Sequence, residues 1–357
     1  MNRKKLRRRP FSAIIIIALL LFAGWCYWAW RDLNRPRIHG SADHLVTLAP
    51  GATINSVISA LMLEGIIAHE LPARVWVIGF ARGRSPKAGD YQFKSPISPI
   101  AALEKVLRGD IATQHFTIPE GYNQFEIARV LGSLTGVKPD KENPGDTVTS
   151  SLLLMKDVSS IKEIDPSARS LEGYLFPDTY DYTSSTTRRQ MVDAMVRRFH
   201  QIWNADRQRQ AQELGMTPRQ VITLASLIEK EAKVDSEREL ISSVFHRRLK
   251  IGMPLACDPT VIYAALLEGK YRGKIYQSDL DRSSAYNTYK RVGLPPGPIA
   301  SPGKRSIDAA LNPAETDYLY FVVDASATNG AHKFSASSAE HDRAVSALRD
   351  AERREMR

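Results

Sequence analysis

Two neighbouring glutamates, Glu229 and Glu231, are the residues of this sequence best placed for proton-transfer chemistry. They close the stretch 217–233 (TPRQVITLASLIEKEAK), whose apolar spacing predicts a helix. On a helical wheel Glu231 falls about 20° from Leu224, inside an apolar stripe that includes Ile228. A carboxyl group held among apolar side chains loses hydration, so its pKa rises and it becomes a general acid near neutral pH. The alternative is that Glu231 lies at a frayed helix end and reaches solvent.

The other glutamate reads as a surface residue. Glu229 falls about 140° from the stripe, on the polar side of the wheel. It precedes Lys233 by four residues, which predicts an exposed ion pair. The helix itself has a clear start, because Thr217 and Pro218 are N-cap and first-turn residues and Gln220 completes a capping box. The sequence therefore predicts one structural and one inward-facing glutamate at the end of a single helix.

Composition and charge exclude several classes of function. The chain has 357 residues, enough for two or three domains, with ordinary hydrophobic (43%) and charged (25%) fractions. Its net charge is +10, but six basic residues lie in residues 1–9, so the remainder carries 10 − 6 = +4. This mild excess gives no case for nucleic acid. Cys26 and Cys257 predict no disulfide, and the eight scattered histidines show no metal-ligand spacing, so neither a metal nor a cofactor is expected.

The N-terminal region predicts a membrane anchor. Residues 11–30 (FSAIIIIALLLFAGWCYWAW) are uncharged and long enough to cross a hydrocarbon core of about 30 Å as a helix. The basic residues 1–10 are expected to stay in the cytoplasm, and the aromatic cluster at the other end suits the opposite interface. A cleavable signal peptide is the alternative, but the apolar run is long and ends without a small-x-small pair. Residues 31–43 read as a polar tether.

The rest of the chain predicts an α+β protein with two folded parts. Residues 44–110 show a strand-helix-strand-helix pattern typical of a small independent module. Residues 111–347 mix helices and short strands around the helix at 217–233, and residues 348–357 form a charged C-terminal tail. Within the second part, 318–324 and 332–335 predict a hairpin. The proline- and glycine-rich stretch 283–303 predicts a long functional loop.

One stretch of the second part suggests a carbohydrate-binding surface. Residues 170–183 (SLEGYLFPDTYDYT) gather aromatic residues around Glu172, Asp178 and Asp181. Aromatic rings offer an apolar face to sugar C–H groups, so this stretch could line a glycan site. A packed loop is the alternative.

Several segments in order resemble one known family, the YceG/MltG-like endolytic murein transglycosylases. The resemblance runs from the anchor to about Val345, and its segments are AGDYQF (88–93), IPEGYNQFEIA (118–128), LEGYLFPDTYDYT (171–183), LASLIEKEA (224–232), DPTVIYA (258–264), SAYNTY (284–289), GLPPGPIASPG (293–303) and YLYFVVD (318–324). In one place the chain departs from the family, whose loop often reads L-Q-[ST]-D-P-T-V. Here Ala256 and Cys257 replace the amide and the hydroxyl.

The resemblance implies an activity and a location. It implies a LysM-like module at 44–110, a catalytic domain at 111–347 and a single-pass inner-membrane protein whose catalytic domain is periplasmic. It implies endolytic cleavage of the bond between N-acetylmuramic acid (MurNAc) and N-acetylglucosamine (GlcNAc) in nascent strands, which leaves 1,6-anhydro-MurNAc ends and terminates glycan polymerisation. Its implied partners are peptidoglycan glycan strands, the inner membrane and peptidoglycan synthases (penicillin-binding proteins), with no nucleic acid.

The resemblance also implies residue roles. The second glutamate of the family's E-K-E motif is the catalytic one, which is Glu231 here, in agreement with the helical wheel. Asp258, Tyr286 and Asn287 are weaker candidates for substrate binding, with loop packing as the alternative for each. Two other functions stay open: a muramidase that uses water with Asp178, Glu172 or Asp258 as second carboxylate, and a non-catalytic peptidoglycan-binding scaffold.

Overall fold

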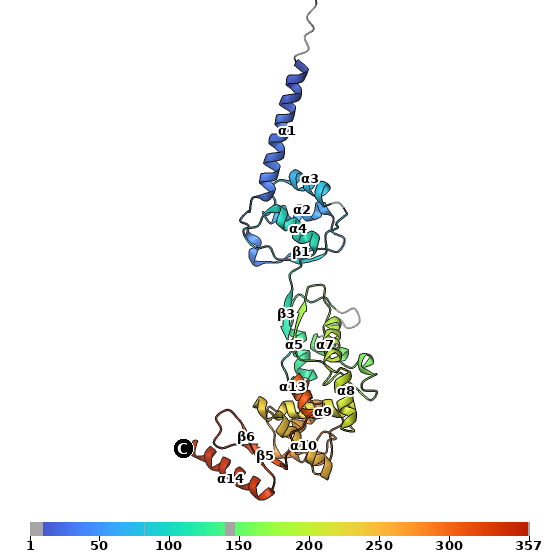
Figure 1. The fold of residues 1–357 in the computed structure, drawn as a ribbon, viewed down its shortest axis with the longest axis vertical. Helices are drawn as coiled ribbons and strands as arrows, with labels where there is room; N and C mark the ends of the chain where they lie inside the picture. The colour runs from blue at the N-terminus through green and yellow to red at the C-terminus, as the bar shows by residue number, and fades with distance from the viewer. Residues whose placement is uncertain (1–9, 82, 140–146, 356–357) are drawn as a thin grey trace, which may run out of the picture. The chain divides into compact units, whose positions relative to one another are not determined.

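The computed structural model describes residues 10–81, 83–139 and 147–355, and the chain forms two compact units (Figure 1). The first unit comprises residues up to 114 together with 182–185, and the second comprises 115–181 and the chain from 186 onward. The boundary at 114 lies close to the predicted boundary at 110. The predicted cytoplasmic tail, residues 1–10, lies almost wholly outside the described residues.

The first unit is a small α+β module built on one pair of strands. Its two strands are antiparallel, with Val46 opposite Tyr91. The elements are α1 (Pro10–Asn34), a 3-10 turn η1 (Gly40–Asp43), β1 (Val46–Leu48), α2 (Ile54–Leu63), α3 (Glu70–Phe80), β2 (Gly89–Tyr91) and α4 (Pro99–Arg108). The strand-helix-strand-helix order confirms the predicted pattern, with two helices between the strands. The likeness to a LysM module stays a prediction.

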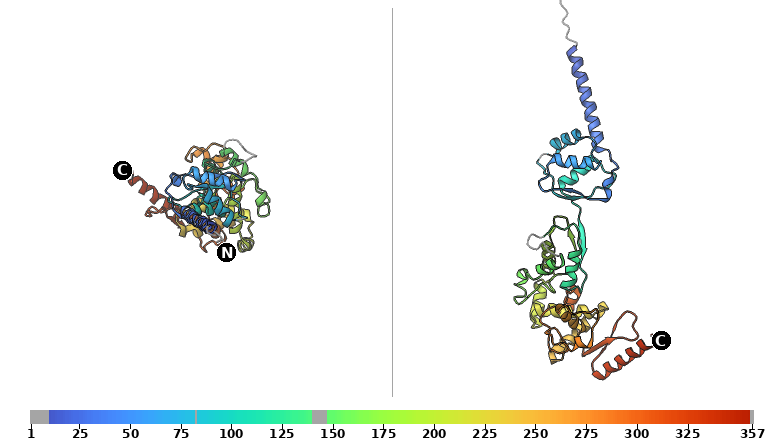
Figure 2. Two further views of the ribbon diagram at one scale, coloured as in Figure 1. Left: turned by 90° about the horizontal axis from the view of Figure 1, so that it is seen from above. Right: turned by 180° about the vertical axis from the view of Figure 1, so that it is seen from behind.

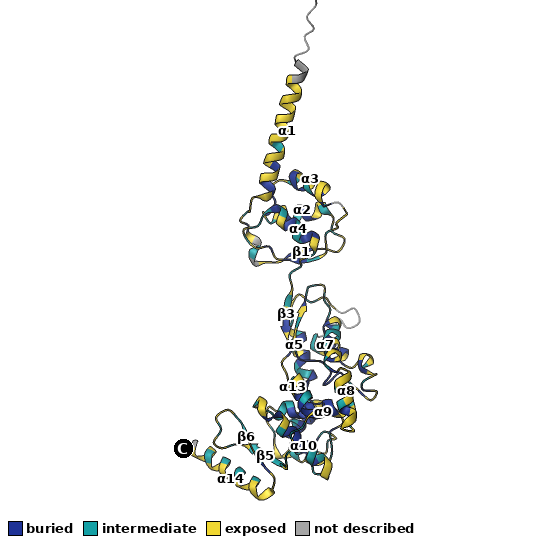
Figure 3. Cartoon of the chain, in the orientation of Figure 1, coloured by how far each residue is buried: buried dark blue, intermediate teal, exposed yellow. Residues whose placement is uncertain are grey.

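Helix α1 has two differently placed halves. Its first part carries exposed apolar side chains from Ile14 to Phe22, drawn yellow in Figure 3. It is the one helix among the described residues that is long and apolar enough to cross a membrane, which fits either an anchor or a signal sequence. Its last turns differ, because Leu33 is buried in the core of the module and α1 contacts α3 and α4.

The predicted tether belongs to the folded module. Helix α1 continues through Arg31 to Asn34, and Arg37 pairs with Ile97 in an isolated antiparallel bridge. The sequence suggested a tether because residues 31–43 are polar, but one apolar side chain, Leu33, joins the core. Asp32 beside it is also buried and pairs with Arg37, so a polar contact as well as an apolar one holds this segment in the module.

The second unit is mainly helical with short strands. Its helices are α5 (Gln124–Ser133), α6 (Thr147–Leu154), α7 (Arg188–Ile202), α8 (Ala205–Glu213), α9 (Pro218–Glu231), α10 (Arg238–Ile251), α11 (Asp258–Leu267), α12 (Gln277–Leu280), α13 (Lys304–Leu311) and α14 (Ser338–Glu355), with 3-10 turns η2 (Ser159–Ile161) and η3 (Asp235–Glu237). Its strands pair as β3 (Gln114–Thr117) with β4 (Thr179–Tyr182) and β5 (Tyr320–Val323) with β6 (His332–Ser335).

Helix α9 is the centre of the second unit. It contacts α8, α10, α11 and α13, and every residue from Val221 to Ile228 is buried. The sequence predicted a single apolar stripe, yet small polar residues on the other faces are buried too. One of them, Ser226, donates to Thr223 O (2.7 Å) and accepts from Ile299 N (3.1 Å), so its burial leaves the hydroxyl satisfied.

The C-terminal part of the unit is a hairpin with a long helix beside it, seen from behind in Figure 2. Strands β5 and β6 are antiparallel, with Tyr320 opposite Ser335, which confirms the predicted hairpin. Helix α14 contacts both strands. The charged segment expected as a tail from residue 348 is helical as far as Glu355.

Candidate active site

Glu231 is the last residue of α9, whose middle residues are all buried. Thr217 caps the start of α9, since its side chain accepts from Gln220 N (3.3 Å) while Gln220 Oε1 accepts from Thr217 N (2.8 Å). This confirms the predicted capping box. The helix ends at Glu231, and Ala232 turns the backbone into an extended conformation. The rigid packing of α9 thus fixes the position of the Glu231 side chain.

The surroundings of Glu231 favour its protonated form. Burial raises the pKa of Glu231, and the negative charge of Asp258 adds to the effect. A hydrogen bond from Cys257 and the charges of His332 and Lys233 act in the opposite direction. A carboxyl group with a raised pKa can hold a proton near neutral pH and give it to a leaving group.

A thiol contacts the candidate acid directly. Cys257 Sγ donates to Glu231 Oε1 over 3.0 Å. Burial raises the pKa of the Cys257 thiol well above its usual value, so the thiol stays protonated and remains a donor. Against the family's usual loop, this chain lacks a hydroxyl at residue 257. The structure shows that the thiol there supplies a hydrogen bond to Glu231.

The loop that carries this thiol is held from the 284–289 segment. Thr288 accepts from Cys257 N through its hydroxyl (3.0 Å) and from Ala256 N through its carbonyl (3.1 Å). Thr260 donates to Cys257 O (2.6 Å). Ala256 has a positive φ of 47°, an unusual conformation for a residue with a side chain. These bonds set the direction of the thiol.

Glu229 is buried, and its predicted surface ion pair with Lys233 is wrong. Its side chain is 7% exposed and lies 3.4 Å from Arg238. It also accepts from Gly303 N (2.9 Å), the cap of α13. The wheel placed Glu229 on a polar side, but α10 and α13 cover that side of α9. A carboxylate at the first turn of α13 is favourable, so Glu229 ties three helices together.

A cavity of about 800 Å³ opens in front of Glu231. Asp258, Tyr263, His332 and Arg129 are among its lining residues. Asp258, at the first turn of α11, accepts from the Tyr289 hydroxyl (2.7 Å). The structure therefore brings one of the three predicted substrate-binding residues, Asp258, to the same cavity as Glu231.

The other two lie elsewhere. Asn287 is fully buried, donates to Leu280 O (2.9 Å) and Arg282 O (2.8 Å), and accepts from Tyr289 N (3.0 Å). Its side chain therefore holds the loop and has no face toward either cavity. Tyr286 lines a second cavity, where its ring lies 5.1 Å from that of Tyr263.

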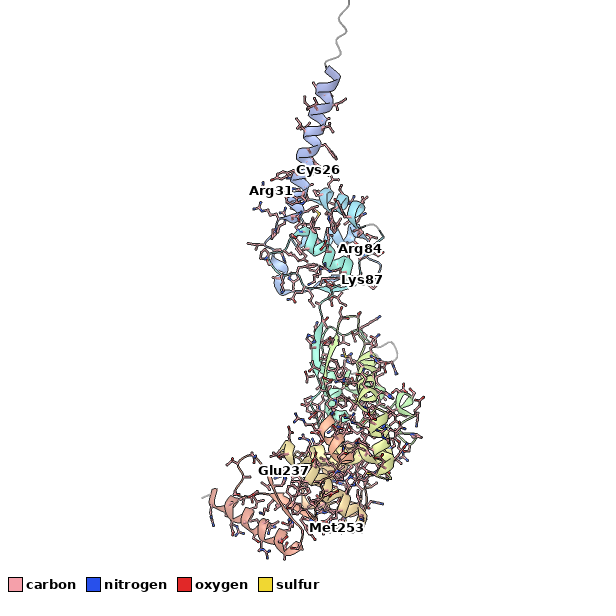
Figure 4. The ribbon with its side chains drawn as sticks, in the orientation of Figure 1. Cys26, Arg31, Arg84, Lys87, Glu237 and Met253 are labelled. Atoms are coloured by element: carbon pink, nitrogen blue, oxygen red, sulfur yellow. The ribbon has the colours of Figure 1, made fainter. Side chains whose placement is uncertain are left out.

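A histidine–glutamate pair at the cavity escaped the sequence reasoning. His332 Nδ1 lies 2.8 Å from Glu237 Oε2, and His332 N donates to Glu237 Oε1 (2.7 Å). Both side chains are less than 10% exposed. Figure 4 labels Glu237 in this part of the second unit. Only strand β6 brings His332 to the cavity, and its isolated position in the sequence gave no signal of a role.

Within residues 10–81, 83–139 and 147–355, no three His, Cys, Asp or Glu side chains gather in an arrangement that could hold a metal ion.

Comparison with known proteins assigns the chain to a family. The sequence model of the YceG-like family matches residues 46–347. An endolytic murein transglycosylase of Bacillus subtilis is 32% identical over 318 residues, covering 84% of this chain and 83% of that protein. One from Streptococcus pneumoniae is 29% identical, covering 94% of this chain and 64% of its own length. A crystal structure of a yceG-like protein from Listeria monocytogenes aligns with a TM-score of 0.55 and 30% identity, covering 84% of this chain and 98% of that one. The chain belongs to the YceG-like family.

Proposed function

We propose that this protein is an endolytic lytic transglycosylase of peptidoglycan, with Glu231 as its one catalytic carboxyl group. The observation that carries the proposal is the half-buried Glu231 at the wall of a cavity of about 800 Å³, where burial raises its pKa, in a chain whose relatives are named endolytic murein transglycosylases. The bond cut is that between MurNAc and GlcNAc inside nascent strands, and the products carry 1,6-anhydro-MurNAc ends. Such cleavage would end glycan polymerisation.

Glu231 serves as acid and then as base. In its protonated form it donates to the glycosidic oxygen, so the bond to the muramoyl C1 breaks. The resulting carboxylate takes the proton of the muramoyl C6 hydroxyl, whose oxygen closes onto C1, and Glu231 returns to its starting form. The Cys257 thiol donates to Oε1, which leaves Oε2 for the substrate. Because water is not the nucleophile, no second carboxylate is needed.

A muramidase that uses water is the alternative, and the geometry reduces the number of residues that could serve as its second carboxylate. Glu172 lines the second cavity, and Asp178 is paired with Arg198 (2.8 Å), so neither shares the cavity of Glu231. Only Asp258 among the three candidates lines it. A hydrolase would therefore pair Glu231 with Asp258.

The chemical form of the released ends tests the proposal. Digestion of purified peptidoglycan followed by mass spectrometry should give muramoyl ends lighter by one water than hydrolysed ends. Hydrated reducing ends alone would establish the muramidase. Binding of glycan without any cleavage would establish the non-catalytic scaffold.

The location follows from the anchor. We propose that α1 holds the protein in the inner membrane with residues 1–10 in the cytoplasm and the catalytic unit in the periplasm, since the basic flank obeys the positive-inside rule. The module at 44–110 is proposed to bind or position glycan, and peptidoglycan synthases (penicillin-binding proteins) are proposed partners.

A further inference from the structure

A second cavity of about 750 Å³ adjoins the one that contains Glu231, and Tyr263 lines both. At the start of α5, Gln124 lines the second cavity, while its neighbours Asn123 and Phe125 line the first. Its volume lies within the roughly 300–1,000 Å³ of pockets that hold drug-sized ligands. Its walls come from three segments that carry the family resemblance, which contribute Glu172, Tyr286 and Pro298. The proton-transfer chemistry at Glu231 uses none of these residues.

The second cavity is lined by more basic than acidic side chains. Lys156, Arg169 and Arg219 line it, together with the carboxyl groups of Asp165 and Glu172. Asp165 is 1% exposed in its side chain and is neutralised by Arg219 at 2.7 Å. Burial raises the pKa of Glu172 to about 7, so this group carries only part of a negative charge near neutral pH.

Two of the cations remain available to a ligand. Lys156 and Arg169 are exposed, and within the described part of the chain neither one is paired with a carboxylate. Arg219, in contrast, also donates to Pro296 O (2.7 Å) and is used by the fold. Two cationic side chains that are not paired with a carboxylate thus line this cavity, and such a pair is suited to a carboxylate-bearing ligand.

The wall between the cavities is aromatic and firmly held. Tyr263 donates its hydroxyl to Glu172 Oε2 (2.8 Å) and accepts from Gln124 Nε2 (3.0 Å). Glu172 also accepts from Gln124 N (3.0 Å), at the start of α5. Glu172 therefore fixes the partition that separates the second cavity from the first, rather than acting as a second catalytic carboxylate.

We propose that the second cavity binds the carboxylate-bearing peptide attached to a muramoyl sugar of the strand being cut. This inference rests on the proposed function, because it takes peptidoglycan as the substrate. In a peptide-bearing strand the lactyl carboxyl group of each muramoyl sugar is amide-bonded to its peptide, so the sugars are neutral and the free carboxylates belong to the peptides. Lys156 and Arg169 therefore complement the peptide and not the glycan. The shared Tyr263 wall lets one substrate reach both cavities.

The test compares one glycan with its peptide carboxylates free and amidated. The detergent-solubilised full chain is assayed on uncross-linked peptide-bearing strands and on the same strands whose peptide carboxylates have been converted to methylamides, because removal of the peptides by an amidase would expose the lactyl carboxylates of the sugars. The variant Lys156→Gln/Arg169→Gln should lower the ratio of kcat/KM for the free-carboxylate over the amidated strands about tenfold, the low end for loss of charged hydrogen bonds. The matched variant Arg209→Gln/Lys250→Gln removes the same charge from exposed positions outside both cavities and should leave the ratio unchanged.

A binding measurement separates this inference from the catalytic proposal. The peptide Ala-γ-Glu-diaminopimelate is titrated by calorimetry into Glu231→Gln and into Glu231→Gln carrying the Lys156 and Arg169 substitutions. Binding to the first and its loss in the second support the peptide site, even if neither glycan is cleaved and the transglycosylase proposal fails. An unchanged kcat/KM ratio, or equal peptide binding by both proteins, would overturn the peptide site.

Discussion

At the scale of single residues, the two glutamates of α9 should separate chemistry from stability. Glu231→Gln keeps the shape of the side chain but has no acidic proton to give. Loss of general acid–base catalysis costs about 10²–10⁴-fold in rate, and a group that serves in both roles should reach the upper part of this range. The measurement is the rate of anhydromuramoyl release by mass spectrometry. Near wild-type release by Glu231→Gln would show that another group is the acid.

The same substitution should affect stability in a pH-dependent way. Burial raises the pKa of Glu231, so the folded state disfavours the carboxylate. Below the unfolded pKa the group is protonated in both states and has no effect, and stability falls as the pH rises from there toward the folded pKa. Glu231→Gln should therefore raise the Tm at pH 8 and change it little at pH 4. A Tm that falls at both values would contradict a buried, protonated Glu231.

Glu229→Gln should lower the stability of the protein and leave the type of product unchanged. Its carboxylate is buried against Arg238 and accepts from Gly303 N, so removal of the charge weakens contacts among three helices. A loss of about 1–3 kcal/mol in unfolding free energy is expected for a buried charged contact. The products released should still carry anhydromuramoyl ends, measured beside Glu231→Gln. An unchanged Tm would mean that Glu229 makes no stabilising buried contact, as expected for the exposed ion pair with Lys233 that the sequence predicted.

The Cys257 thiol should tune the pH dependence of the reaction. Its hydrogen bond favours the ionised form of Glu231 and lowers the pKa of that group. Cys257→Ala removes the donor, so the pKa of Glu231 should rise further and the alkaline limb of the kcat–pH profile should move to higher pH. Cys257→Ser retains a donor and should keep the limb near its original place. If both variants shift it equally, the packing of the sulfur matters and its hydrogen bond does not.

At the scale of elements, the contact between the 171–183 segment and the 293–303 loop depends on one glycine. Gly173 has φ +83°, and a Cβ there would lie 2.4 Å from Pro298 Cβ. Gly173→Ala combines a left-handed backbone with overpacking, each worth about 1–3 kcal/mol. Gly215→Ala is the matched control, because its φ is +67° with nothing within 4 Å. Thermal melts should show a clearly larger decrease in Tm for Gly173→Ala than for Gly215→Ala. Equal decreases would mean that the 293–303 loop moves to accommodate the added Cβ at no measurable cost in stability.

At the scale of the whole molecule, α1 joins a stretch long and apolar enough to cross a membrane to the core of the module. A full-length protein should fractionate with membranes and keep its original N-terminus, as checked by intact mass. A mature N-terminus beyond Trp30 would show a cleaved signal peptide. Leu33 is 4% exposed in the module core, so a chain that starts at residue 35 should melt lower than one that starts at residue 29. Loss of a buried leucine costs about 2–5 kcal/mol.

Much of this protein was determined by local pattern in its sequence. The capping box at Thr217, the hairpin at 320–335 and the apolar run of α1 each depend on residues close together in the chain, so periodicity and turn chemistry predicted them. The inward direction of Glu231 followed from the wheel alone. The family resemblance suggested the chemistry that is proposed for the cavity, and the comparisons confirmed the family.

Only the tertiary structure decided how each polar residue is used. The wheel placed Glu229 on an exposed face, but α10 and α13 cover that side of α9. Asn287 was a candidate for substrate binding, but its side chain is hydrogen-bonded within its own loop. The pairing of His332 with Glu237 joins residues 95 positions apart. A helical wheel describes one helix in isolation, whereas burial and partners depend on which other helices pack against it, and that information lies in contacts between distant parts of the chain.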